Sequence, residues 1–179
     1  KTFRELAQIC NISLGSVSKI MNGLQKEGYI IASNKTFVEL IRKEALLDKW
    51  VNLINEKVLP NCIKGKYMFG RNTQNEWKYI DADIEWSGEP GAALLTNYLN
   101  PEKFSLFTNL DKISLIQKAG LLPENQGNIT VYKPFWNENS INNKTVHPLL
   151  IYAQLMHDGN DRNIETAKII YNEYIQHNI

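Results

Sequence analysis

The chain has 179 residues, and its 20 basic side chains against 19 acidic ones leave a net charge of +1. Hydrophobic residues make up 43% and charged residues 22%, a balance that excludes a disordered tail, a collagen-like fibre and a coiled-coil rod. No apolar run approaches the roughly 18–20 residues that a membrane-crossing helix needs, so we expect a soluble, cytoplasmic protein. Cys10 and Cys62 are too few for a disulfide framework or a zinc site, and we expect no metal and no cofactor.

Charge is shared unevenly along the chain. Residues 1–59 hold nine basic and six acidic side chains, a net +3, and residues 60–179 hold eleven and thirteen, a net −2. The asymmetry is milder than the basic bias of many nucleic-acid-binding domains. It nevertheless favours the N-terminal third as the place of any contact with DNA.

The N-terminal segment predicts two short helices. Thr2 and Glu5 form a capping box, in which the threonine oxygen accepts a backbone N–H and the glutamate reaches back, and a helix follows it. Ser13 caps a second helix, and apolar residues at helical spacing give that helix one buried side. Gly28 ends the second helix, because glycine readily adopts the left-handed conformation of a helix terminus.

A hairpin is expected after the second helix. Residues 29–31 and 36–40 predict its strands, and residues 33–35 predict the turn between them. The order of two helices and a hairpin is typical of a winged helix-turn-helix, which we assign to residues 1–40. A winged helix normally has one more helix before these two. Because the chain begins at Lys1 rather than at a methionine, we interpret the sequence as trimmed, with that first helix missing.

Two further regions follow. Residues 41–59 predict an amphipathic connector helix, which Pro60 should stop because proline lacks the N–H that a helix interior needs. Residues 60–179 predict a C-terminal mixed α/β domain. Its strands are expected at 66–69, 77–80, 104–108 and 128–132, and its helices after Ser87, at 109–119 and, closing the chain, at 148–156 and 163–176. The expected fold class is therefore α+β or α/β.

The second N-terminal helix has the properties of a DNA-reading element. Such a helix lies in the major groove, where each base pair shows a distinct pattern of donors and acceptors. It needs a buried stripe on one side and small polar or basic residues on the other, and residues 14–26 offer both. We expect base contacts from Ser13, Ser16, Lys19 and Asn22, and contacts to the DNA backbone from Ser18, Lys26 and, at the hairpin turn, Lys35. The competing interpretation is a winged helix that binds only protein.

Two other clusters offer residues for a catalytic or metal site. A metal is suggested by His147, His157, Asp158 and Asp161, but residues 158–160 are typical of a turn, which favours a solvated loop. A nuclease is suggested by the acidic run of Asp81, Asp83, Glu85 and Glu89. The lysine that a restriction-type nuclease places just beyond its second acid is missing, and no phosphate-binding loop, dinucleotide fingerprint or nucleophile elbow occurs. We expect no enzyme.

Three stretches of the C-terminal half resemble a known family. They read SGEPGAALLTNYLNPE at residues 87–102, GNI through FW at 127–136, and PLLIYAQL with GNDRN from residue 148 onward. They are similar to the GGE-x-AA-x-LLT-x-YL-x-PE, GNV…FW and PLLVYADL…GDPRN stretches of AbiEi-type antitoxins, and the likeness extends to residues 14–18 and Trp50. The chain departs from that pattern at Ser87, where the family usually has glycine, and at Asp161, where it usually has proline.

The resemblance implies a transcriptional regulator and antitoxin of a type IV toxin–antitoxin system, of the kind linked to abortive phage infection. It implies two partners: double-stranded DNA of the protein's own operator, and a nucleotidyltransferase-like toxin that the antitoxin need not contact directly. One winged helix buries only about 600–1,000 Å² on DNA, so tight binding predicts two copies, by dimerisation or by cooperative binding to repeats. The alternatives are a nuclease or nucleotide-processing enzyme guided by the winged helix, and an adaptor that docks a protein.

Glu89 and Arg162 fall within the resembling stretches but need no role in chemistry. We interpret both as structural residues. Glu89 is expected to cap its own helix, and Arg162 to bind carbonyl oxygens or Asp158.

Overall fold

The structure is a computed structural model that describes residues 1–32, 38–70, 74–136 and 144–177. The chain divides into two compact units, Lys1–Trp50 and Val51–Ile179. The predicted hairpin turn, with Lys35, lies outside the described residues, as does most of the polar loop before residue 144. Within the described ranges, no helix combines the length and the apolar character needed to cross a membrane.

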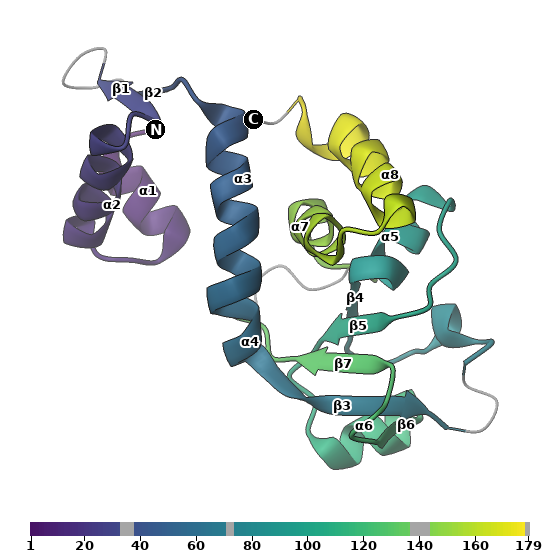
Figure 1. Cartoon of the computed structure of the whole chain (residues 1–179). Helices are drawn as coiled ribbons and strands as arrows, with labels where there is room; N and C mark the ends of the chain where they lie inside the picture. The colour runs from purple at the N-terminus through teal and green to yellow at the C-terminus, as the bar shows by residue number, and fades with distance from the viewer. Residues whose placement is uncertain (33–37, 71–73, 137–143, 178–179) are drawn as a thin grey trace. The chain divides into compact units, whose positions relative to one another are not determined.

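The first unit follows the predicted order of elements. It contains α1 (Phe3–Cys10), α2 (Leu14–Lys26), β1 (Ile30–Ala32), β2 (Val38–Leu40) and most of α3 (Lys43–Leu53) (Figure 1). The capping box is confirmed, because the Thr2 hydroxyl accepts the Glu5 N–H and the Glu5 carboxylate accepts the Thr2 N–H. Ser13 caps α2 by accepting the Ser16 N–H at 3.0 Å. Gly28 follows α2 with φ +74°, the left-handed conformation predicted for it.

The core of the first unit is small. β1 and β2 pair antiparallel, with Ile30 opposite Leu40. The buried apolar residues Val17, Ile30 and Leu47 come from α2, β1 and α3. No residue of α1 is buried.

The predicted connector is helical, but it does not end at Pro60. α3 continues into a π-helical turn, η1 (Ile54–Val58), and then into α4 (Leu59–Cys62). In the π turn the Leu59 N–H bonds the Ile54 carbonyl, five residues back. The wide turn explains the continuation, because in a regular helix the proline ring would clash with the carbonyl four residues earlier. The expectation that Pro60 stops the helix is therefore wrong.

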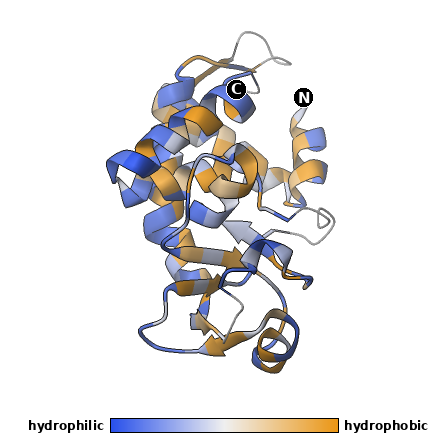
Figure 2. Cartoon of the chain, turned by 90° about the vertical axis from the view of Figure 1, so that its right-hand side faces the viewer, coloured by the Kyte–Doolittle hydropathy of each residue, from blue (hydrophilic) through white to orange (hydrophobic). Residues whose placement is uncertain are grey.

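The second unit is built on a mixed five-stranded sheet of order β4-β5-β7-β3-β6. Its strands are β3 (Ile63–Phe69), β4 (Glu85–Ser87), β5 (Phe104–Phe107), β6 (Leu121–Pro123) and β7 (Ile129–Tyr132). β5 and β7 run parallel, with Phe104 opposite Ile129, and the other neighbouring strands are antiparallel. Figure 2 shows hydrophobic segments in several strands of the sheet, and Leu106, Ile129 and Val131 are fully buried.

Aromatic clusters lie on both faces of this sheet, because successive residues of a strand point to opposite sides. Phe104 contacts Phe69, Trp77 and Trp86 edge to face. Phe107 points the other way, where it stacks on Tyr132 and contacts Trp136. The two clusters link strands that are distant in sequence.

Helices pack beside the sheet in two groups. The helices of this unit are α5 (Gly88–Thr96), α6 (Lys112–Ala119), α7 (Pro148–Asp158) and α8 (Asp161–Ile170), which continues as the π-helical η3 (Tyr171–Ile175). α5, α7 and α8 pack on one another next to β4 and β5, and α6 lies against β6 (Figure 1). A Cβ atom at Gly91 would lie 2.8 Å from Ile151 Cδ1 and 2.9 Å from the Trp86 carbonyl oxygen. Glycine is therefore required where α5 approaches α7 and β4.

Most predicted elements of the second unit are confirmed, two differ, and two short strands were not predicted. Residues 77–80 are not a strand; Trp77–Tyr79 forms the 3₁₀ turn η2, which buries the Trp77 ring and leaves Tyr79 80% exposed. The helix expected from residue 109 begins at Lys112, because Asp111 caps it by accepting the Ser114 N–H. The three-residue strands β4 and β6 were not predicted.

Candidate functional site

The exposed side of α2 is the candidate nucleic-acid interface. Helical spacing places six exposed residues within one face: Gly15, Ser16, Lys19, Asn22, Gly23 and Lys26. We call these six residues the α2 face. On the opposite side Val17 is 4% exposed, and Met21 and Leu24 are half-buried. One side of α2 therefore packs inside its unit and the other lies open.

The α2 face is positively charged. α2 contains two lysines and no acidic residue. The first acid after the helix, Glu27, forms an ion pair with Lys49 and so does not neutralise Lys19 or Lys26. Across the described parts of the chain, the side chains of Lys19, Asn22 and Lys26 make no hydrogen bond or ion pair with another residue. These three side chains are free to contact a ligand.

The two serines at the start of α2 are already hydrogen-bonded. Ser13 Oγ accepts the Ser16 N–H and lies 2.9 Å from Ser16 Oγ. Ser13 Oγ thus keeps one further hydrogen-bonding site and Ser16 Oγ keeps two. Ser18 lies about 100° around the helix from Lys19 and is half-buried. The structure thus gathers Ser16, Lys19, Asn22 and Lys26 on one face, with Ser13 at its leading end and Ser18 at its edge.

Two cations beside the end of α2 were not predicted as site residues. The Arg42 guanidinium and the Lys49 ammonium both contact the Tyr29 ring, each 5.4 Å from the ring centroid. A hydrogen bond to Glu27 raises the pKa of Lys49. These contacts hold the start of α3 against the end of α2. No local signal could reveal them, because the partners lie 13 and 20 positions after the tyrosine.

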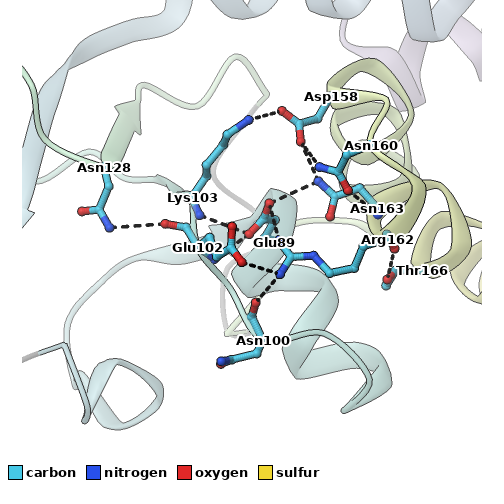
Figure 3. A network of polar contacts seen from close by, with 10 residues as sticks. All are labelled: Glu89, Asn100, Glu102, Lys103, Asn128, Asp158, Asn160, Arg162, Asn163 and Thr166. Atoms are coloured by element: carbon cyan, nitrogen blue, oxygen red, sulfur yellow. Dashed lines mark hydrogen bonds and ion pairs between the residues drawn. The ribbon is translucent and has the colours of Figure 1, made fainter.

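A polar network centred on Glu89 lies in the second unit (Figure 3). Glu89 is in the first turn of α5 and is 5% exposed. Its carboxylate accepts the backbone N–H groups of Glu102 at 2.6 Å and Lys103 at 3.1 Å. It also accepts hydrogen bonds from Arg162 Nη2 at 3.3 Å and Asn163 Nδ2 at 3.2 Å. Glu89 therefore does not cap its own helix, as expected, but joins α5 to the segment before β5 and to α8.

The outer residues of this network complete the connection. Arg162 Nη1 donates to the Asn100 carbonyl at 3.2 Å and to Glu102 at 3.0 Å. The predicted binding of carbonyl oxygens by Arg162 is thus confirmed. Asp158 pairs instead with Lys103 and accepts from Asn160 and Asn163. The network joins three segments that are up to 74 positions apart.

The acidic run proposed for a nuclease does not gather in space. Glu89 is bound within the network, Glu85 is 5% exposed in β4, and Asp81 and Asp83 lie at the surface. Burial, and then the neighbouring Asp83 carboxylate, raise the pKa of Glu85. Among the residues that the structure places, no three His, Cys, Asp or Glu side chains are grouped to hold a metal ion.

The histidine suggested as a metal ligand has a structural contact. His147 caps α7, because its Nδ1 atom accepts the Leu149 N–H at 3.2 Å. His157 and Asp158 form the last turn of α7, and Asp161 begins α8.

Comparison with known protein families supports the regulatory interpretation over the catalytic one. A family model described as "Transcriptional regulator, AbiEi antitoxin, Type IV TA system" matches residues 39–176, which is 138 of the 179 residues. The match includes the whole Glu89 network and begins after α2. Searches among curated proteins and among solved structures found no match. As the resemblance predicted, the chain belongs to the AbiEi antitoxin family of transcriptional regulators from type IV toxin–antitoxin systems.

Proposed function

We propose that this protein is a DNA-binding repressor of its own operon and an antitoxin that counteracts a nucleotidyltransferase-like toxin. In this proposal residues 1–40 are a winged helix-turn-helix, residues 41–59 a connector and residues 60–179 the antitoxin domain. The observation that supports DNA binding most directly is the α2 face, which has no acid and two lysines without an ion-pair partner among the described residues. Membership of a family of transcriptional regulators supports it independently.

The chemistry of the α2 face suits a DNA duplex. Lysine side chains attract phosphates over a range set by the salt concentration. The free amide of Asn22 can donate to and accept from a base edge. Ser13, Ser16 and Ser18 add short hydroxyls, and Lys35 extends the proposed contact to the wing. Because a single module of this size buries little surface on DNA, we propose that two copies bind the operator together.

The antitoxin role is assigned to the second unit, where the family match lies. Its polar network and aromatic clusters connect helices and strands and so stabilise the fold, and the described carboxylates of the network act as structural contacts. In a type IV system such a domain need not bind the toxin itself. The proposal therefore places DNA recognition and toxin neutralisation in different parts of the chain.

The first experiment measures binding of the full chain to the DNA upstream of its own gene. A scrambled duplex of equal length and composition serves as the reference, and both are titrated across a salt series. We expect selective binding to the upstream DNA, with log affinity falling linearly as log salt rises, because phosphate contacts release counterions. Equal affinity for the two duplexes at every salt concentration would contradict the proposal. Magnesium-dependent cleavage of the bound duplex would favour the nuclease alternative.

A pair of double variants assigns the binding to the α2 face. Lys19→Ala with Asn22→Ala should remove the discrimination between the duplexes while the fold stays intact, because neither side chain makes a described contact within the chain. Lys168→Ala with Asn172→Ala is the matched control, since it removes one exposed lysine and one exposed asparagine from a helix of the second unit. Loss of binding in the control alone would place the DNA contact elsewhere.

A further inference from the structure

We propose that Asn22 and Lys19 read two base pairs of the operator that are one or two steps apart: Asn22 an A·T pair through adenine, and Lys19 a G·C pair through guanine. The inference rests on the proposed function, in which α2 lies in the major groove. It adds the base composition of the site, which DNA binding alone does not specify.

Only some polar side chains of α2 are available to contact a base. Ser13 and Ser16 are hydrogen-bonded to each other at the start of the helix, and Ser18 is half-buried. Lys19 and Asn22 are exposed and make no hydrogen bond or ion pair within the described structure. Near the middle of α2, Lys19 and Asn22 are therefore the polar side chains whose hydrogen-bonding groups are all available to the edge of a base.

The functional groups of these two residues select different bases. An asparagine amide has one acceptor and two donors, which match adenine N6–H₂ and N7 in the major groove. A lysine ammonium has only donors, which match the two acceptors of guanine, O6 and N7. Thymine and cytosine offer neither pattern to these side chains in full.

Helix geometry sets the distance between the two base pairs. Residues 19 and 22 are three positions apart, a rise of about 4.5 Å along the helix, and about 60° apart around it. Stacked base pairs are about 3.4 Å apart. A helix inclined in the groove therefore brings Lys19 and Asn22 to base pairs one or two steps apart.

Two glycines allow α2 to come close enough for the short asparagine to reach a base. A Cβ atom at Gly23 would have no atom within 4 Å, and one at Gly15 would meet only Ser13 Oγ at 3.8 Å. Packing inside the unit thus requires glycine at neither position, although glycine weakens a helix. Their absent side chains leave the α2 backbone open on both sides of Lys19 and Asn22.

The test is selection of bound sequences from a randomised duplex library by the full chain and by single variants. The wild-type consensus should contain an adenine and a guanine one or two steps apart. Asn22→Ala should lose the adenine preference and keep the guanine, and Lys19→Ala should do the reverse. Each change should weaken the cognate site by roughly tenfold or more. Lys26→Ala, a backbone contact in this scheme, should lower affinity for all sequences and leave the consensus unchanged.

The outcomes separate this inference from the function on which it rests. No sequence preference in the wild-type selection would overturn the proposed function itself. A clear consensus that Asn22→Ala and Lys19→Ala leave unchanged would overturn the base assignment and leave operator binding in place. Thermal unfolding of each variant, monitored by circular dichroism, confirms that a lost preference comes from the side chain and not from an unfolded helix.

Discussion

The buried carboxylate of Glu89 shows how much of the second unit depends on one side chain. Its two oxygens accept two backbone N–H groups and hydrogen bonds from Arg162 and Asn163. Glu89→Gln replaces one of these oxygens by an NH₂ group that faces donors. We expect the free energy of unfolding to fall by about 2–4 kcal/mol, because buried donors lose a charged acceptor.

Urea denaturation of Glu89→Gln measures this loss, and Glu102→Gln is the matched control. Glu102 also pairs with Arg162, but its side chain is 77% exposed, so its substitution should cost no more than about 1 kcal/mol. Equal losses in the two variants would mean that the buried carboxylate has no special part in the network.

The buried Glu85 carboxyl should make the free energy of unfolding depend on pH. Burial and the Asp83 carboxylate raise its pKa in the folded state above the ordinary value of about 4.3. Between that value and the raised one, the folded state binds more protons than the unfolded state, so Glu85 makes stability fall as the pH rises through this window. Glu85→Gln has no charge to bury, and we expect it to melt higher than the wild type at pH 7 and at the same temperature near pH 4.

The measurement is the difference in melting temperature between wild type and Glu85→Gln over a pH series. Asp81→Asn is the control, since Asp81 is exposed in the same acidic run. A difference for Glu85→Gln that stays constant from pH 4 to pH 8 would show that the change acts through packing and not through the charge.

Sequence patterns identified the residues whose partners are close in the chain. Thr2 with Glu5, and Ser13 with the start of α2, were predictable because a cap reaches only three positions along a helix. The partner of Glu89, in contrast, lies 73 positions away at Arg162, and only the tertiary fold brings them together. The contact of Arg42 with Tyr29 could not be predicted for the same reason, since the two residues are 13 positions apart.

At the scale of elements, α2 shows a conflict between helix stability and an open surface. Gly23 lies inside a 13-residue helix, and a Cβ atom at this position would have no neighbour within 4 Å. Gly23→Ala should therefore raise the free energy of unfolding by about 0.5–1 kcal/mol, because alanine favours helix and loses less backbone entropy on folding. If DNA packs against this face, the same change should weaken operator binding.

Thermal unfolding and DNA titration of Gly23→Ala measure the two effects together. Gly15→Ala is a second variant on the same face, with similar space around it. A variant that is more stable and binds the operator as tightly as the wild type would show that the DNA does not approach the middle of α2.

Periodicity predicted the long elements and failed on the short ones. Strong apolar patterns located α2, α7 and α8 and the strands β3, β5 and β7. β4 and β6 have three residues each, too few for an alternating pattern. Pro60 was misjudged because the π turn before it depends on local backbone geometry that no residue pattern records. At residues 77–80 the aromatic composition suggested a strand, but Trp77–Tyr79 forms a 3₁₀ turn whose Trp77 ring contacts Trp86.

At the scale of the whole molecule, the sequence motifs of the C-terminal half were more informative about function than any single physical feature. They indicated the family that matches residues 39–176, whereas composition and net charge indicated only a folded protein. The α2 face lies outside that match, so its assignment rests on charge, exposure and spacing. DNA binding and toxin neutralisation are therefore assigned to different parts of the chain and can be tested separately.

This separation leads to a prediction about the two activities. The variant with Lys19→Ala and Asn22→Ala should no longer repress a reporter placed behind the operator, but it should still protect cells from the toxin. The toxin must be expressed from an unrelated inducible promoter, because protection then cannot arise from repression of the toxin gene. Reporter output and cell survival are measured in the same strain, with the amount of antitoxin followed by immunoblotting.

Equal protection by the variant and the wild type would place neutralisation outside the α2 face, as expected if residues 60–179 perform it. Lys168→Ala with Asn172→Ala controls for the loss of a lysine and an asparagine, and it should leave repression intact. If the α2 variant loses protection at a normal protein level, DNA binding and neutralisation share one surface. The assignment of antitoxicity to the second unit alone would then have to be abandoned.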